Sequence, residues 1–548
     1  MKKAKLNSPI ILLAIFMAYQ IGLCISTETG GGYRAKNNGV HIDEMYSYIF
    51  ANSYDGNNIS EIDSYWERWI DGHSIMETIT VQKGERFSYN KVYYNNSVDC
   101  HPPLFYFLLH TICSLFPNKY TIWFGITLNI IFLVVEDILI YLLTKELTDH
   151  QMVSVLPTVL WGISFACMNT VMFVRMYMLL TVCTTGFLYI TVKCIKQKLN
   201  LKLGLLLFLF SLSGVFTHYF FILFAFFITL FYCIRRFIKK DFREGVIFGA
   251  TISLSVALLL IFYPYVITQA TGSKTNNIGN EVSRSILNFS TLPDKITNFI
   301  KWFSLRFFNK YTFLLICAFA VLMLALYIEK NRHIKNEMND NLTLIIQLII
   351  VTMIVAITSL HVAGVYATER YIYNLYPIFA VLLISFTYKI IENLDNRKIF
   401  TAALSLIVLL NVGTFALKPR CDYLYETEKK IVEKIMDTNA KYCIVITANS
   451  PTTNRRSTIV PTCNVIRFNN FERIYLTTGD TMKDIDSILS DINYNDGTLI
   501  YLTTDKYWMD GYEPDEYMQR LIQQTDKFNN YEYIEDLEFG KLFLLESR

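Results

Sequence analysis

The sequence has little charge for its length. Only 18% of its 548 residues are Asp, Glu, Lys or Arg, whereas 53% are hydrophobic and 15% are aromatic. Such a composition argues against an ordinary soluble protein and indicates a polytopic membrane protein. The net charge is only +3 and no basic stripe is present, so nucleic acid is not an expected partner.

Signals for metal-binding or disulfide frameworks are also missing. The eleven cysteines are scattered, and several fall inside apolar segments. They form no CxxC pair and no His/Cys cluster of the kind that binds zinc, and their spacing indicates no disulfide framework. The sequence also has no internal repeat, which argues against an inverted-repeat transporter.

Long apolar segments dominate what is present. Segments long enough to cross about 30 Å of hydrocarbon number eleven, at 8–25, 120–144, 152–171, 174–194, 201–217, 219–235, 245–267, 311–328, 342–361, 372–391 and 398–417. The first follows a basic start and could be a signal peptide. Because "GLCISTE" is a poor cleavage site, we expect an uncleaved signal-anchor.

Basic loops predict the orientation of these segments. "MKKAK", "KCIKQKLNLK", "RRFIKKDFREG", "EKNRHIK" and "NLDNRK" all face the cytoplasm if the short apolar segment 102–116 does not span. We therefore interpret 102–116 as an in-plane or re-entrant helix. The predicted organisation is a first transmembrane helix at 1–25, an outer loop at 26–119, a transmembrane bundle at 120–417 and an extracytoplasmic domain at 418–548.

The two outer regions have their own patterns. In the first, "HIDEMYSYIFANSY" predicts a helix start, "DSYWERWIDGH" an amphipathic helix at the membrane interface, and "ITVQKGERFSYNKVYY" a hairpin. Region 418–548 contains short β-type runs such as "CIVIT" and "TLIYLTT", separated by helical patterns. It predicts a small α/β domain.

An acidic pair begins the first outer helix. Asp43 and Glu44 are adjacent, so their side chains diverge by about 100° on a helix and cannot serve one site in the same way. The simpler explanation is capping, because acidic residues in a first turn complement the helix dipole.

Further polar residues lie at the outer ends of the apolar segments. They are Asp99 and His101 before two prolines, Arg175 between two apolar runs, His218 in a tight turn and Arg370 at a segment start. Each has a structural alternative: a plain helix start, snorkelling to the interface, a satisfied turn histidine, or an ion pair with the preceding glutamate. A single outer site with a carboxylate base, two arginines and two histidines accounts for all of them together. Such a site suits transfer of a group from a membrane-embedded phosphate donor.

The order and spacing of these motifs resemble a known family. The chain is similar to membrane glycosyltransferases of the GT-C class, in particular the bacterial branch of the dolichyl-phosphate-mannose–protein mannosyltransferase family, which includes aminoarabinose transferase-like enzymes. The resemblance covers about residues 8–417 and is carried by "HIDEMYSYIFA", "DCHPPLFYFLLH", "RMYML", "THYF" and "RYIYNLYPIFAVLL". It implies a polytopic GT-C-like helical fold in the cell membrane.

The resemblance also implies a reaction. A polyprenyl-phosphate-linked sugar would be attacked by the hydroxyl of a glycan, lipid or protein acceptor, with inversion and with Asp43 as the general base. The leaving phosphate would be stabilised by Arg175 and Arg370, with His101 and His218 as hydrogen-bonding groups. Further candidates at the site are Glu44, Asp99, Tyr177 and Tyr371. Asp43, Glu44 and Asp99 could supply ligands to a divalent metal, but the resemblance implies none, and no metal or other cofactor is expected.

Two other classes remain as alternatives. A transporter or lipid flippase predicts polar groups near the midplane, and Glu136 with Asp137 are the clearest such residues. A binding or assembly protein centred on region 418–548 would leave the outer-face motifs unexplained. The sequence does not distinguish a hexose from a pentose donor.

Overall fold

The computed structural model forms two compact units. The first, here called the helical unit, comprises Met1–Tyr33, Asp99–Phe105 and Gly125–Cys421. The second, the sheet unit, comprises Arg34–Val98, Tyr106–Phe124 and Asp422–Arg548. Within them the structure describes residues 8–28, 34–35, 40–53, 59, 62–271, 284–285, 288–331, 340–417, 420–421, 428–447, 449–450, 455–456, 465–479, 485–503, 513–537 and 540–547.

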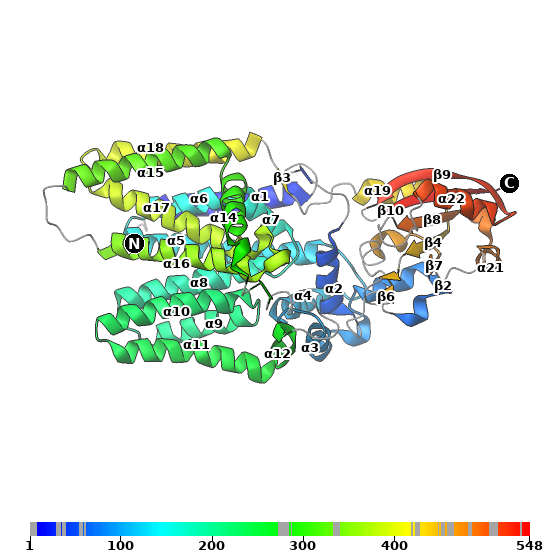
Figure 1. Ribbon diagram of the computed structural model, residues 1–548, viewed down its shortest axis with the longest axis horizontal. Coiled ribbons are helices and arrows are strands. Elements are labelled where there is room, and N and C mark those ends of the chain that lie inside the picture. Colours follow the sequence, from blue (N-terminus) through cyan, green and yellow to red (C-terminus); the bar gives the residue numbers. More distant parts are fainter. Residues whose placement is uncertain are drawn as a thin grey trace, which may run out of the picture. The chain divides into compact units, whose positions relative to one another are not determined.

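Long apolar helices build the helical unit (Figure 1). Among the described residues, nine helices are long and apolar enough to cross a membrane. The last but one is counted with the 3₁₀ turn Glu369–Leu375 that precedes it. The nine are α1 (Ser8–Glu28), α5 (Trp123–Thr148), α8 (Tyr177–Lys196), α10 (Phe220–Ile238), α11 (Phe242–Phe262), α15 (Lys310–Asn331), α16 (Asp340–Val362), α17 (Tyr376–Glu392) and α18 (Arg397–Leu417). The chain is therefore a multi-pass membrane protein.

Two of the eleven expected spans are missing from these nine, and a third short helix was not expected to span. The segment at 152–171 is not one straight helix, because α6 (Leu156–Gly162) and α7 (Phe165–Met172) meet at a bend of 65°. Helix α9 (Leu201–Val215) has 15 residues, about 22 Å of rise. Helix α4 (Leu104–Leu115) has 12 residues, about 18 Å, which is too short to cross the hydrocarbon core. That length agrees with the prediction of a re-entrant or in-plane helix.

Two adjacent carboxylates lie inside helix α5. Glu136 and Asp137 are fully buried, and Glu136 Oε1 accepts a hydrogen bond of 2.6 Å from the Thr185 hydroxyl of α8. A buried charge in a span requires a protein partner. Glu136 therefore has a structural contact within the bundle.

A six-stranded sheet is the centre of the sheet unit (Figure 1). Its three central strands β7, β4 and β8 are parallel, β10 and β9 extend it antiparallel on one side, and β2 closes the other. Buried side chains of α21 (Ile485–Leu489) and α22 (Pro514–Gln523) complete the core. In sheet order the strands are β2 (Trp69–Asp71), β7 (Arg473–Thr478), β4 (Tyr442–Thr447), β8 (Thr498–Thr503), β10 (Gly540–Ser547) and β9 (Phe528–Leu537).

The edge strand β2 comes from the first outer loop, not from the C-terminal region. Trp69 pairs with Tyr475 and Ile70 with Ile474 in antiparallel register. The Trp69 indole is buried in the sheet core and donates a 2.9 Å hydrogen bond to the Ile488 carbonyl. The predicted interface helix over "DSYWERWIDGH" is therefore wrong: the segment forms a 3₁₀ turn (Asp63–Tyr65) and this strand. The buried sheet core accepts the tryptophan that was expected at the membrane interface.

The predicted hairpin over "ITVQKGERFSYNKVYY" is also wrong. The segment forms a 3₁₀ turn (Lys83–Glu85) followed by helix α3 (Tyr89–Ser97). Helix α3 packs on α2 (Ile42–Asn52), where Asn95 donates a 2.9 Å hydrogen bond to the Ser53 carbonyl. Asn95 and Asn96 also donate to the Phe50 carbonyl, so α3 satisfies carbonyls at the end of α2.

Candidate active site

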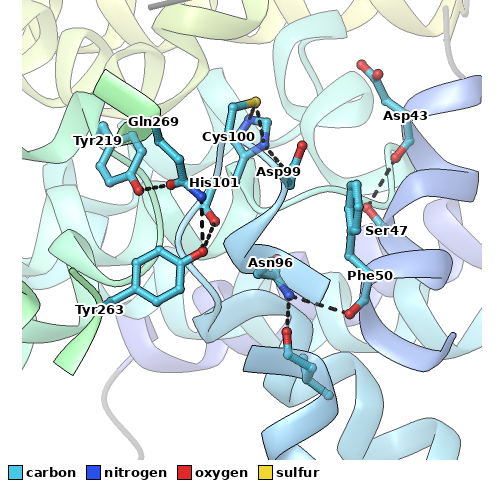
Figure 2. Close-up of polar contacts among 11 residues, drawn as sticks. Asp43, Ser47, Phe50, Asn96, Asp99, Cys100, His101, Tyr219, Tyr263 and Gln269 are labelled. Carbon is cyan, nitrogen blue, oxygen red and sulfur yellow. Dashed lines mark hydrogen bonds and ion pairs between the residues drawn. The ribbon is translucent and has the colours of Figure 1, made fainter. Parts of the chain in front are cut away.

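The turn Asp99–Cys100–His101 opens the candidate site in the helical unit. Asp99 Oδ2 lies 2.8 Å from His101 Nδ1, and Cys100 Sγ lies 3.3 Å from the same nitrogen (Figure 2). Burial raises the pKa of Asp99, but the charge and hydrogen bond of His101, followed by the charge of Arg175, outweigh it and hold the pKa below its usual range. Asp99 is therefore an ionised carboxylate that orients the imidazole of His101.

His218 occupies the turn between α9 and α10. Its ring is buried, 5.6 Å between centroids from the ring of His101. Burial, and then the positive charges of His101, Arg175 and Arg370, place the pKa of His218 well below its ordinary value of 6.5. At neutral pH this imidazole is uncharged.

The hydrogen bonds of His218 determine which nitrogen carries its proton. Nδ1 accepts a 3.1 Å hydrogen bond from the Phe220 backbone N–H, so the neutral ring holds its proton on Nε2. Nε2 is buried and has no hydrogen-bond partner among the described residues. A buried donor of this kind is costly unless something binds to it. The turn therefore presents an N–H group suited to an oxygen ligand.

Two arginines complete the positive surroundings of His218. Arg175 is 5% exposed and lies at the break between α7 and α8, while Arg370 lies in the 3₁₀ turn Glu369–Leu375. Both guanidinium groups act on the pKa of His218. Three cationic or potentially cationic groups around a neutral N–H donor favour an anion with several oxygens, such as a phosphate.

Aromatic rings line the same region. The ring of Tyr177 is 5.9 Å from His218 and 5.9 Å from Tyr373, and the ring of Tyr371 is 5.0 Å from Phe220. The structure thus brings seven residues singled out in the sequence into one region of the helical unit. They are Asp99, His101, Arg175, Tyr177, His218, Arg370 and Tyr371.

A chain of hydrogen bonds that the sequence did not indicate ends on the backbone carbonyl of His101. The Tyr219 hydroxyl donates to Gln269 Oε1. Gln269 Nε2 donates to the Tyr263 hydroxyl at 3.2 Å, and that hydroxyl donates to the His101 carbonyl at 3.3 Å (Figure 2). These hydrogen bonds connect the N-terminal end of α10 and the C-terminal end of α11 to the Asp99–His101 turn. Its only sequence signal was the tyrosine next to His218.

Glu369 has a partner that the sequence analysis missed. Its carboxylate accepts 2.8 Å and 3.2 Å hydrogen bonds from Arg306 Nε and the Tyr373 hydroxyl. The sequence had suggested an ion pair with the neighbouring Arg370. Arg306 lies more than 60 residues earlier in the chain, so spacing alone could not indicate it.

The acidic pair at the start of α2 belongs to the sheet unit. Glu44 is 1% exposed, and its Oε2 accepts a 3.2 Å hydrogen bond from the His41 backbone N–H, completing a capping box. The Asp43 side chain is 24% exposed, and one of its carboxylate oxygens lies 3.9 Å from His41 Nδ1. The carboxylate of Glu44 therefore caps the helix, whereas that of Asp43 is partly exposed.

One group of described residues has the donor atoms of a metal site. The ligand atoms of Asp99, Cys100 and His101 lie within 4.8 Å of one another. The 2.8 Å hydrogen bond between Asp99 and His101 already engages one donor of each.

The solved structures that the chain resembles are membrane glycosyltransferases. No protein-family model matches the sequence, and no curated protein matches it either. ArnT from Cupriavidus metallidurans, bound to undecaprenyl phosphate, is similar over 98% of this chain and 97% of its own, with 10% identity and a TM-score of 0.46. The apo oligosaccharyltransferase of Archaeoglobus fulgidus is similar over 97% and 74%, with 10% identity and a TM-score of 0.48. AglB from the same organism, in complex with an inhibitory peptide and a dolichol-phosphate, is similar over 100% and 75%, with 10% identity and a TM-score of 0.46. Resemblances this distant assign no activity, which has to be inferred from the chain's own residues.

Proposed function

We propose that the protein is a membrane glycosyltransferase that moves a sugar from a polyprenyl-phosphate donor to an acceptor hydroxyl. The observation that supports this most strongly is the buried Nε2–H of His218, unpartnered among the described residues and surrounded by His101, Arg175 and Arg370. Such a group can bind a phosphate within a multi-pass membrane protein. A phosphate ester of a long lipid is the substrate that could reach it from the bilayer.

The proposed reaction is a single displacement. The acceptor oxygen attacks the anomeric carbon while the bond from that carbon to the phosphate oxygen breaks, so the configuration inverts. The phosphate leaves with the bonding electron pair, and the positive charges of Arg175 and Arg370 with the His218 N–H stabilise its growing charge. Asp43 takes the proton of the acceptor hydroxyl as general base. Glu44 holds the start of α2 through its cap.

The side of the membrane is part of the proposal. If the basic loops face the cytoplasm, the active site and region 418–548 are extracytoplasmic. A cysteine in place of the exposed Lys119, which follows α4, tests the arrangement with a membrane-impermeant thiol reagent. Labelling from outside intact cells supports it, and protection would mean that 102–116 spans the membrane.

The test of the reaction uses purified full-length protein and a panel of labelled polyprenyl-phosphate hexoses and pentoses. We expect Asp43→Asn to lower transfer by about 10²–10⁴-fold, the range for losing a general base. Asp63→Asn is the matched control, because Asp63 is an exposed aspartate of the same outer region. Retained transfer by Asp43→Asn would exclude that residue as the base. An absence of turnover with every lipid-linked donor would instead favour a transporter or flippase.

A further inference from the structure

We propose that a basic cleft at the other ends of α8 and α10 binds the phosphate head group of an anionic phospholipid. The cleft is lined by Ile195 of α8, by Tyr232, Arg235 and Arg236 of α10, and by Lys239 directly after α10. The space between these side chains that no atom fills is about 170 Å³ and includes open solvent. Neither this cleft nor its ligand depends on the glycosyltransferase proposal.

The three cations of the cleft differ in how they are paired. Arg236 has two carboxylate partners, Glu244 at 3.0 Å and Asp241 at 3.3 Å, and its Nε donates to the Tyr232 hydroxyl at 3.1 Å. Its charge is thus compensated within the protein. Arg236 forms a structural wall of the cleft and is not a free binding group.

Arg235 and Lys239 lack this compensation. Arg235 donates from NH1 to the side-chain oxygen of Gln347 on α16 at 2.7 Å, but its Nε is buried without a hydrogen-bond partner in the described part of the chain. No carboxylate lies within ion-pair distance of Arg235 or Lys239 among the residues described. A buried guanidinium N–H next to a free ammonium group favours an anion as the missing partner. Stabilisation of the helix C-terminus accounts for the positive charges but not for the unpartnered buried nitrogen.

The surroundings of the cleft favour a lipid over a soluble anion. Large apolar side chains on the same turn are exposed, namely Ile234, Phe237, Ile238 and Phe242. In a multi-pass protein such side chains face the acyl chains of the bilayer, so the cations next to them lie at the level of the head groups. Basic pockets between membrane helices are suited to phosphate head groups at this depth.

The test is a titration of the purified full-length protein in neutral detergent with a fluorescent phosphatidylglycerol. We expect the double variant Arg235→Gln/Lys239→Gln to weaken binding about 25-fold, or about fivefold for each cation. The matched control is Lys198→Gln/Lys202→Gln, which removes the same charge from the nearby exposed turn before and within α9. It should change the affinity by less than twofold.

Three outcomes would overturn the proposal. If both double variants weaken binding equally, general surface charge explains it. If a fluorescent phosphatidylcholine binds as tightly as phosphatidylglycerol, the anionic head group is not what is recognised. If inorganic phosphate at millimolar concentration displaces the lipid completely, the cleft binds free anions. If Arg235→Gln does not fold, the single variant Lys239→Gln provides the test. Lys239 is exposed, and removing its charge should still weaken lipid binding by about fivefold.

Discussion

A single methyl group added at Gly72 should weaken the packing of the first outer loop against the C-terminal sheet. A Cβ at Gly72 would lie 2.0 Å from the backbone carbonyl oxygen of Phe471 and 3.1 Å from that of Phe468. Because both obstacles are backbone atoms, the chain at Gly72 must move away by at least about 1 Å. That movement breaks the 3.1 Å hydrogen bond from the Gly72 N–H to the Glu472 carbonyl and strains the adjoining strand β2. Overpacking of about 1–3 kcal/mol and a lost hydrogen bond of about 1 kcal/mol give a destabilisation of roughly 2–4 kcal/mol for Gly72→Ala.

Thermal unfolding of the detergent-solubilised protein measures this effect. The buried Trp66 and Trp69 pair with Leu476 and Tyr475 of the sheet, and Trp69 lies in β2, which ends just before Gly72, so their fluorescence reports on this contact. For a unit of about 200 residues, a loss of this size lowers the midpoint by roughly 4–16 °C. Gly84→Ala is the control in the same loop, because no atom lies within 4 Å of its added Cβ. Equal midpoints for the two variants would refute the steric argument.

Two further predictions concern the helical unit. The pKa of His218 in the folded protein lies below 6.5, so the unfolded chain binds a proton first as the pH falls. The contribution of His218 to stability is therefore present above about pH 6.5 and is lost at lower pH. Between pH 7 and pH 5 this group should therefore lower the unfolding free energy by up to about 1.4 kcal/mol per pH unit. The variant His218→Gln should show a smaller dependence of the unfolding free energy on pH. If that dependence is unchanged in the variant, His218 is not a neutral buried imidazole. Arg306→Gln leaves the buried carboxylate of Glu369 without its 2.8 Å partner and should destabilise the protein by about 3–5 kcal/mol. Chemical denaturation of Arg306→Gln/Glu369→Gln should show partial recovery, and a double variant as unstable as the single one would argue against the ion pair.

Features that depend on local sequence were predictable. Apolar length alone located the long helices, and the pattern beginning at His41 predicted a helix that the structure places at Ile42–Asn52. Polar residues at the outer ends of apolar segments also led to Asp99, His101, Arg175 and His218, which the fold brings together. In each of these cases the deciding energy comes from neighbours in the sequence or from the common membrane boundary.

Features that depend on distant partners were not predictable. The segment around Trp69 has the composition of an interface helix, yet strand β7 and helix α21, hundreds of residues later, offer this tryptophan a pairing partner and a carbonyl acceptor. The Tyr263 hydroxyl donates to the His101 carbonyl, and Gln269 donates to that hydroxyl, only because several helices pack together. In both cases tertiary contacts outweigh local propensity, which is worth at most about 1 kcal/mol per residue.

Strand β2 also sets the order in which the protein can be completed. Ile70 pairs with Ile474, so the ribosome makes the edge strand roughly 400 residues before its partner exists. At about 5–20 residues per second, the first loop waits for something like 20–80 s with Trp69 unable to reach its core. A chain interrupted before Arg473 leaves that tryptophan and the open strand without their partners. We therefore expect truncation within region 418–548 to damage the first loop as well, and a C-terminal domain exchanged with a related protein to require its own matching β2.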